Sequence, residues 1–349
     1  MGNEVLKNLA LLGIGHIYVV DMDTVEASNL SRSVLFRPGD SGKFKATTAA
    51  HRLAEINPEI AISYLNGNVI TEIGLGAFKS MDLVLSCVDN MEARLFINES
   101  CWKVTKPWIN GGIEAMQGVV DVFVPPDSTC YECTMTDQDY AEMNRRHPCG
   151  LPAEQIIEGK IPTTPTIASI ISAVMVQEAM KLIHGKDVQS GSGWLFFGLT
   201  NQAMKVEYPV SPDCPAHQQM GEPILTLDKS VATITLRQLK TEFKRILGGD
   251  ADIDLGFDLV LNASCVCGEH RELLKRKELL IRGDVICQGC GEVMATEVVS
   301  SIDKRRRKLA NKTLADLGFP PAAIISAACN GNKASIALTG DAPWVINYN

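Results

Sequence analysis

The stretch from residue 17 to residue 46, IYVVDMDTVEASNLSRSVLFRPGDSGKFKA, limits the possible folds of this chain more than any other. It predicts a short apolar strand at Ile17–Val20 that ends in acid at Asp21, then a polar turn and the start of a helix. In an open parallel α/β sheet, ligands bind outside the carboxyl ends of the strands. A carboxylate there can hold a ribose hydroxyl, while Arg32 and Lys45 can hold phosphates. The stretch therefore predicts a nucleotide site placed for a triphosphate, and its alternative is a solvated loop with incidental charges.

Composition and cysteine content narrow the class of protein. The chain has 349 residues, which favours two domains, and 46% hydrophobic residues, which is enough for a sizeable core. Its net charge of −8 argues against binding to nucleic acid. No apolar run reaches the ~20 residues that span a bilayer, so no membrane association is expected. Eleven cysteines without a signal peptide indicate metal binding in a reducing, cytoplasmic compartment rather than disulfides.

Strand and helix patterns alternate along residues 1–221, which predicts an α/β domain with a mostly parallel, Rossmann-like sheet and helices on both faces. Strands are expected at 17–20, 61–65, 83–87, 108–109, 118–124, 194–197 and 205–208, and helices at 5–12, 46–56, 94–103 and 165–183. Gly2 takes the place of the last glycine of a G-x-G-x-x-G turn, with Asp21 nineteen positions later. The first strand and most of the Gly-rich loop of such a unit are therefore expected to be missing, which puts the activity of this chain in doubt.

Short motifs in this region resemble those of a known superfamily. They are Asp21-Met22-Asp23, Ser28-Asn29-Leu30-Ser31-Arg32, Lys45, Cys87-Val88-Asp89-Asn90 followed by Arg94, and a paired-cysteine metal site. In this order, across residues 2–217, they resemble the ATP-binding core of the ubiquitin-activating and ThiF/MoeB/HesA adenylating enzymes. That superfamily also includes bacterial enzymes that adenylate sulfur-carrier proteins.

The resemblance implies ATP-dependent adenylation of a C-terminal carboxylate. Position by position it implies Mg²⁺ on Asp89, ribose on Asp21, phosphates on Arg32 and Lys45, and a nucleotide-binding set completed by Gly2, Asn29 and Asn90. Catalysis of this kind depends chiefly on positioning and on electrostatic stabilisation of the phosphate charge. The alternative for Asp89 is a cap at the start of the following helix.

Two pairs of residues predict a structural zinc site. Cys130 and Cys133 form one C-x-x-C pair, and Cys214 and His217 form a C-x-x-H pair about eighty residues later. Tetrahedral Zn²⁺ takes thiolates and imidazoles from two such turns, and four protein ligands leave no position for water. The related enzymes usually have four cysteines here, so His217 is a departure from their pattern. A redox C-x-x-C is the alternative.

Cys149 is the candidate nucleophile. It lies in Arg145-Arg146-His147-Pro148-Cys149-Gly150, just before the long apolar helix, where thioester-forming members of the superfamily carry their catalytic cysteine. Neighbouring basic side chains favour the reactive thiolate. The alternative is an incidental loop cysteine. Cys87 and Cys101 lie in apolar strand and helix patterns and are expected in the core.

Residues 222–349 predict a smaller α+β domain, with an amphipathic helix at 236–247 and strands near 258–261 and 335–338. Cys265, Cys267, Cys287 and Cys290 resemble a zinc ribbon, although Cys267 with His270 could form one pair instead. By position alone this domain could be a ubiquitin-fold module that recruits a conjugating enzyme. The basic run at 304–308 is expected to be a solvated face.

Together with the resemblance to this superfamily, the sequence implies a cytoplasmic, homodimeric enzyme that adenylates the C-terminal glycine of a ubiquitin-like protein and captures it as a thioester, with ATP, Mg²⁺ and Zn²⁺. One alternative is a sulfur-carrier adenylyltransferase without a thioester step. Another is a non-catalytic scaffold that retains the fold. An NAD-dependent dehydrogenase would explain Asp21 but not Arg32, Lys45 or the zinc pairs.

Overall fold

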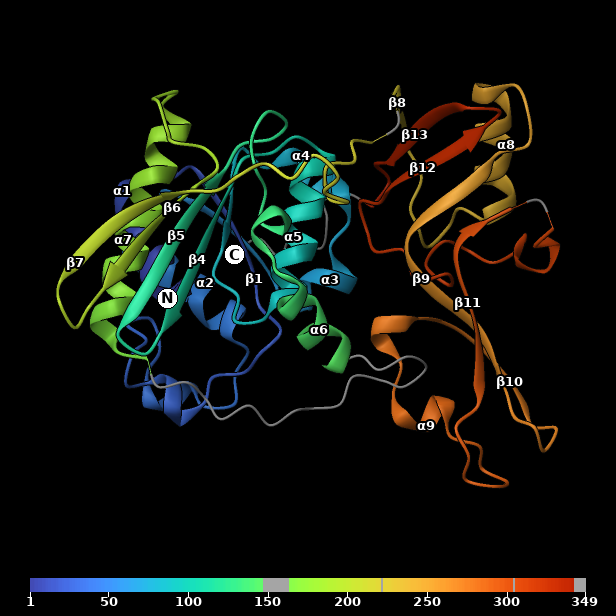
Figure 1. Cartoon of the computed structure of the whole chain (residues 1–349), viewed down its shortest axis with the longest axis horizontal. Coiled ribbons are helices and arrows are strands. Elements are labelled where there is room, and N and C mark those ends of the chain that lie inside the picture. Colours follow the sequence, from blue (N-terminus) through green and yellow to red (C-terminus); the bar gives the residue numbers. More distant parts are fainter. Residues whose placement is uncertain (147–162, 221, 304, 342–349) are drawn as a thin grey trace.

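The computed structural model (Figure 1) describes residues 1–146, 163–220, 222–303 and 305–341. In the first part of the chain the helices and strands are α1 (Gly2–Leu12), β1 (His16–Val20), α2 (Lys45–Ile56), β2 (Ala61–Leu65), α3 (Val69–Glu72), α4 (Leu75–Ser80), β3 (Val84–Ser86), α5 (Met91–Lys103), β4 (Trp108–Glu114), β5 (Gln117–Phe123), α6 (Asp137–Arg146), α7 (Pro165–Ile183), β6 (Ser192–Phe197) and β7 (Gln202–Glu207). Short 3₁₀ turns lie at Ala27–Asn29, Pro38–Asp40 and Glu132–Thr134.

The strands of this part form two sheets. β1 pairs in parallel with β2, and β3 pairs in parallel with β4 at the edge of a five-stranded sheet of order β3-β4-β5-β6-β7. The pairs β4–β5, β5–β6 and β6–β7 are antiparallel. The α/β class is confirmed, but the sheet is mixed rather than mostly parallel. Short hairpin connections join β4 to β5 and β6 to β7, and β6 pairs antiparallel with β5 after the long connection that contains α6 and α7.

Helices cover both faces of the five-stranded sheet (Figure 1). α7 and α1 pack together, with α7 against β4 and β5, while α5 packs against β3 and β4 from the other face. α1 ends as expected at Gly13, whose φ of 74° is the left-handed conformation that glycine adopts at a helix end. α5 begins at Asn90, whose side chain accepts the Ala93 amide.

The long apolar helix α7 belongs to the core. Its 19 residues would suffice to cross a membrane by length and composition alone, although the apolar runs of the sequence suggested no such segment. One face is nonetheless buried, by Ile167, Ala168, Ile171, Ser172, Met175, Val176 and Ala179. A helix buried on one face against a sheet is typical of the core of an α/β domain.

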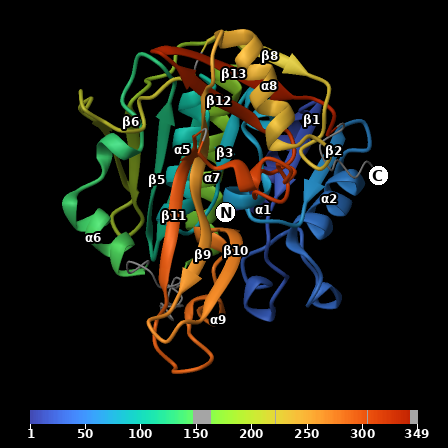
Figure 2. The same cartoon turned by 90° about the vertical axis from the view of Figure 1, so that its right-hand side faces the viewer.

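The rest of the described chain forms a six-stranded sheet of order β10-β9-β12-β13-β8, with β11 also on β9. Its elements are β8 (Ile224–Leu227), α8 (Leu236–Leu247), β9 (Asp252–Ser264), β10 (His270–Arg276), α9 (Arg282–Val285), β11 (Ala295–Ile302), β12 (Ile324–Cys329) and β13 (Asn332–Leu338), with 3₁₀ turns at Lys277–Leu279 and Arg307–Leu309. Figure 2 shows α8 beside β8, β12 and β13, while β9, β10 and β11 run away from them towards α9. The expected α+β arrangement is confirmed. The domain boundary at residues 221–222 stays a prediction.

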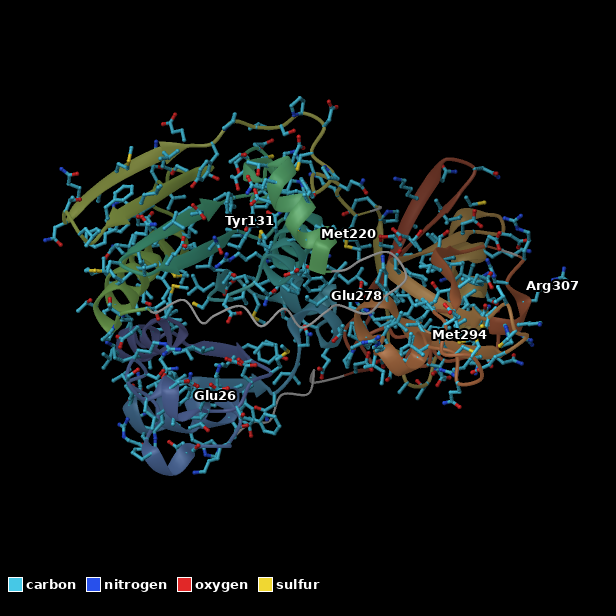
Figure 3. All side chains as sticks on the ribbon, turned by 60° about the horizontal axis from the view of Figure 1, so that its bottom comes forward. Glu26, Tyr131, Met220, Glu278, Met294 and Arg307 are labelled. Carbon is cyan, nitrogen blue, oxygen red and sulfur yellow. The ribbon has the colours of Figure 1, made fainter. Side chains whose placement is uncertain are left out.

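The two parts meet through close backbone contact. The amide of Gly76 donates to the carbonyl of Ala322 at 2.9 Å. A Cβ on Gly74 would lie 2.3 Å from the carbonyl oxygen of Pro321, so only glycine fits there. Met220, labelled in Figure 3 between the two parts, packs in the same apolar cluster as Ile324.

A buried arginine adds to this junction. Arg276, at the end of β10, is 3% exposed, and its guanidinium lies 4.2 Å from the ring centroid of Phe257. Its Nη2 donates to the carbonyl of Ile70, which belongs to α3 in the first part, at 3.1 Å. The far end of the β9–β10 pair is therefore tied to the first part by a charged group with fixed partners.

Candidate functional site

The acid after β1 and the lysine that opens α2 lie in one small network. The Asp23 amide donates to the Asp21 carboxylate at 2.9 Å. Lys45 donates from its amide to the Asp23 carbonyl, at 2.9 Å, and from Nζ to the Asp23 carboxylate, at 2.7 Å. The start of α2 is thereby fixed against the loop after β1. The predicted ribose ligand and one predicted phosphate ligand are neighbours.

The acid after β3 joins this network. Burial raises the pKa of Asp21, the charge of Lys45 lowers it, and the charges of Asp23 and Asp89 raise it further. The Asp89 carboxylate is therefore close enough to act on Asp21 across the ends of two strands from different sheets. Helix α5 is capped by Asn90, whose side chain accepts the Ala93 amide at 2.8 Å. Asn90 therefore caps α5, and the Asp89 carboxylate is not used for this purpose.

The charges of two cations act on the start of α1. Burial lowers the pKa of the Met1 α-amino group, and among its neighbours the charges of Arg32 and Lys45 lower it as well. A Cβ on Gly2 would lie 3.7 Å from the Cβ of Cys87, so this helix start lies beside the end of β3. Helix N-termini with basic side chains beside them suit phosphate oxygens.

The polar turn after β1 holds Arg32 in place. Asn29 is buried, and its side-chain oxygen accepts the Glu26 amide at 3.0 Å. Arg32 donates from Nη1 to the carbonyl of Ser28, also in this turn, at 2.8 Å. The Asn29 side chain therefore stabilises the turn, and its place in the nucleotide-binding set stays a prediction.

A buried polar cluster beside the site was missed by the sequence reasoning. Asp121 on β5 accepts from Asn110 Nδ2 at 2.9 Å and from the Tyr208 hydroxyl at 2.8 Å, and burial raises its pKa. Arg94, which donates to the carbonyl of Val88 at 2.9 Å, also acts on Asp121 through its charge. The sequence showed only that Asn110 and Asp121 are polar residues within two apolar strand patterns. It did not indicate that these two side chains contact each other.

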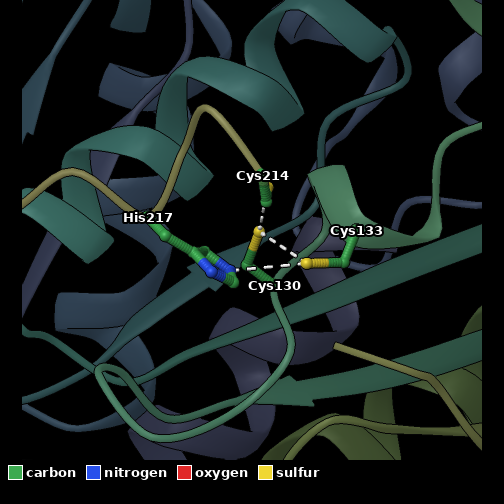
Figure 4. A group of neighbouring side chains, drawn as sticks. All are labelled: Cys130, Cys133, Cys214 and His217. Carbon is green, nitrogen blue, oxygen red and sulfur yellow. Dashed lines mark hydrogen bonds between the residues drawn. The ribbon is translucent and has the colours of Figure 1, made fainter. Parts of the chain in front are cut away.

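The first predicted ligand set forms a compact cluster (Figure 4). The Sγ atom of Cys130 lies 3.6 Å from that of Cys214 and 3.8 Å from that of Cys133, and Cys133 Sγ lies 3.4 Å from His217 Nε2. With Zn–S bonds of about 2.3 Å and Zn–N bonds of about 2.0 Å, tetrahedral ligands lie about 3.5–3.8 Å apart. The four side chains therefore fit one tetrahedral zinc ion.

Residues around this cluster orient its ligands. The His217 ring stacks on the buried Trp102 with centroids 4.1 Å apart, and burial lowers the pKa of His217, which favours the neutral form that binds metal. Asn98 on α5 accepts the Tyr131 amide at 3.0 Å. Burial raises the pKa of the Cys130 thiol.

The second predicted ligand set also comes together. Cys265 and Cys290 have Sγ atoms 3.3 Å apart, and Cys267 and Cys287 have Sγ atoms 3.4 Å apart. Cys265, Cys267, Cys287 and Cys290 all lie within 4.8 Å of one another. His270 is not part of this set, because its Nδ1 bonds to Ser264 Oγ at 2.9 Å.

Three further cysteines were singled out in the sequence. Cys149, the predicted nucleophile, lies outside the described residues. Cys101 is fully buried in α5, and Cys87 packs beside the main core cluster, as their apolar surroundings in the sequence predicted.

Comparison with known proteins gives consistent results. The ThiF family model matches residues 1–216. The ubiquitin-like modifier-activating enzyme 5 of Dictyostelium discoideum is 32% identical over 229 residues, which cover 61% of this chain and 58% of that one. Its Arabidopsis thaliana counterpart is 30% identical, over 52% of this chain and 45% of that one. The chain thus spans about half the length of these curated relatives.

A solved structure shares the fold. The crystal structure of E. coli MccB with succinimide has a TM-score of 0.51 and 24% identity, over 62% of this chain and 63% of that one. At this identity the likeness concerns the fold alone.

Proposed function

Since this chain belongs to the ThiF family, we propose that it adenylates the C-terminal carboxylate of a ubiquitin-like protein with ATP. The names of the relatives support the class of partner. The observation that carries the proposal is the network of Asp21, Asp23 and Lys45 at the carboxyl end of β1, together with the charge of Asp89 that acts on Asp21. A dinucleotide site would not need Arg32 and Lys45 together at one helix start.

The proposed reaction is an in-line displacement at phosphorus. A carboxylate oxygen of the partner attacks the α-phosphorus of ATP, and the bond to the bridging oxygen of the β-phosphate breaks. The products are an acyl-adenylate and pyrophosphate, which leaves with the electron pair of the broken bond. The protein lowers this barrier by alignment and by positive charge near the leaving oxygens.

Each charged side chain then has a proposed task. Asp21 accepts from a ribose hydroxyl, while Arg32, Lys45 and the amides at the start of α1 hold phosphate oxygens. Lys45 has to exchange Asp23 for phosphate, and this is feasible because Asp23 is half-exposed and such ion pairs contribute little. Asp89 fits a role as the Mg²⁺ ligand, because its carboxylate is not used as a cap. Bound Mg²⁺ would neutralise phosphate charge.

We extend the proposal to the partner steps. Cys149 attacks the acyl-adenylate carbonyl as a thiolate, AMP leaves, and a thioester remains. The region from residue 222 onward recruits a conjugating enzyme, and the chain acts as a homodimer in the cytoplasm. Cys130, Cys133, Cys214 and His217 hold zinc as a structural ion.

The nucleotide site is tested with a matched pair of lysines. Lys45→Ala should weaken Mg·ATP binding at least tenfold, about 1.4 kcal/mol, measured by calorimetry. Lys43→Ala is the control, because Lys43 is mostly exposed and bonds to Asp40 at 2.9 Å, away from Asp21. Equal affinities of the two variants would contradict the site.

The reaction is tested by ATP–pyrophosphate exchange with a panel of ubiquitin-like proteins that end in glycine. Asp89→Ala should abolish exchange with the active member of the panel. Cys149→Ala should retain exchange and lose the covalent, thiol-sensitive adduct. Exchange without any adduct in the wild type would favour the sulfur-carrier alternative. ATP binding without exchange across the whole panel would favour the scaffold.

A further inference from the structure

The extension formed by residues 262–297 has almost no apolar core of its own. Its buried apolar cluster contains Ala263, Cys287 and Met294, with Cys265 and Leu273 packed against it. The large cluster of the same sheet is separate and lies around α8, β12 and β13. So few buried side chains do not offset the conformational entropy lost when a segment of this length is ordered. Something other than apolar packing has to hold its tip.

Four sulfur atoms lie at this tip, two from each of two turns. Cys265 and Cys267 belong to the turn between β9 and β10, and Cys287 and Cys290 to the loop between α9 and β11. The close pairs run between the turns, with Sγ–Sγ distances of 3.3 Å and 3.4 Å. A disulfide would need about 2.05 Å, and tetrahedral zinc thiolates lie about 3.8 Å apart. The arrangement is that of ligands around a common centre.

Both turns have the same backbone design. The amide of Gly268 donates to the Cys265 carbonyl at 3.0 Å, and that of Gly291 donates to the Cys287 carbonyl at 3.0 Å. Each glycine directly follows the second cysteine of its turn, with φ of 98° and 77°. Residues other than glycine rarely adopt a positive φ. Glycine at these positions therefore allows a tight turn in which both cysteine side chains point towards the same centre. The repetition in two unrelated segments indicates a shared requirement.

A carboxylate braces the second turn. Glu269 Oε2 accepts the amides of Gln288, at 2.9 Å, and Gly289, at 3.3 Å, and the thiol of Cys287, at 3.0 Å, while Oε1 accepts from Arg271 at 2.5 Å. Both oxygens are therefore engaged with donors. Glu269 belongs to the turn between β9 and β10, and it holds the Cys287–Cys290 turn in place from across the cluster. Little rearrangement is therefore needed when a metal binds.

We propose that Cys265, Cys267, Cys287 and Cys290 bind one metal ion with four thiolates, zinc in preference to harder cations, and that this ion fixes the extension. Four sulfur ligands select Zn²⁺ among the common divalent ions of a cell and leave no open position, so the ion is structural. It joins the β9–β10 turn to the loop before β11, and both β10 and β11 pair with β9 at Ser264.

The test uses the full chain and counts metal ions by mass spectrometry after purification under reducing conditions. Wild-type protein should contain two zinc ions per chain. The double variant Cys267→Ser/Cys290→Ser should contain one, and it perturbs packing little because both residues are exposed. Cys329→Ser is the control, because Cys329 is a buried cysteine of β12 outside the cluster, and it should keep two. A double variant with the wild-type zinc content overturns the proposal.

A second measurement uses wild-type protein, so it tests the proposal even if the double variant does not fold. Metal-free wild type titrated with Co²⁺ should give the charge-transfer absorption of a four-thiolate site in addition to that of a three-thiolate, one-imidazole site. A spectrum of the second kind alone overturns the proposal. Mg·ATP binding by the double variant should equal that of wild type, so the outcome is independent of the nucleotide site.

Discussion

The two cysteine clusters have similar ligand chemistry and very different surroundings. The first cluster consists of Cys130, Cys133, Cys214 and His217; it joins residues 84 positions apart and lies in an apolar cluster with the buried Trp102. The second cluster consists of Cys265, Cys267, Cys287 and Cys290. It joins residues 20 and 25 positions apart at the end of an extension, and Cys267 and Cys290 are exposed. Sequence spacing alone would class both as zinc sites of one kind.

Chain entropy explains only a small part of the expected difference. The cost of closing a loop grows with the logarithm of its length, so loops of 84 and 20 residues differ by about 1 kcal/mol. We expect the first cluster to matter more, because a metal there would fix the Cys214–His217 segment to α5, which begins beside the proposed nucleotide site. A metal in the second cluster would fix a segment that contributes little to either large core. On the proposed metal content, a similar ion would support a whole domain in one place and a local structure in the other.

Loss of a ligand from the first cluster should have the largest effect. Zinc binding contributes ~10–16 kcal/mol to structural sites, and typical domains are stable by only ~5–15 kcal/mol. Cys130→Ser should therefore unfold the first part of the chain or lower its thermal midpoint severely, as measured by near-ultraviolet circular dichroism.

The control for this variant is Cys101→Ser. Cys101 is a fully buried cysteine of α5 that lies outside both clusters, so it reports the cost of a buried hydroxyl alone, about 1–3 kcal/mol. If both variants unfold at the same temperature, the first cluster holds no metal that matters for stability.

The order of metal release should be the next largest difference. A chelator reaches exposed sulfur first, so the second cluster should lose its zinc before the first, and a colorimetric zinc indicator should record two phases. Cys267→Ser/Cys290→Ser should remove the fast phase only. A single phase in wild type, or loss of the slow phase in this variant, would show that burial does not separate the two sites.

Sequence reasoning succeeded where the determinants are local. The chelating pairs are recognisable because their ligands are two or three residues apart, and α1, α2 and α8 follow from their periodicity and end signals. The Asn110–Asp121–Tyr208 cluster depends on the register of strands far apart in the chain, which no local pattern specifies. The contact of Gly74 with Pro321 was equally out of reach, because it joins separate regions.

Asn90 shows what a motif leaves open. Its motif predicts a place in the nucleotide-binding set, and in the structure its side chain caps α5 by accepting the Ala93 amide. An amide side chain can both cap a helix and bind a ligand, so the residue type does not specify the task. The nucleotide-binding role of Asn90 stays a prediction.

The smallest difference concerns the residues that brace each cluster, and it offers a matched pair of truncations. Asn98 accepts the amide of Tyr131, next to Cys130, and Glu269 accepts the amide of Gln288, next to Cys287. Asn98 is fully buried, so Asn98→Ala leaves an amide donor without a partner or water, at a cost of about 1–3 kcal/mol. Gln288 is exposed, so water replaces the carboxylate after Glu269→Ala, and the change in stability should be smaller.

Urea unfolding of both variants measures the two costs under one condition. A larger loss for Glu269→Ala than for Asn98→Ala would mean that the extension depends on its brace more than the buried cluster does, and that exposure is the wrong basis for ranking the two sites.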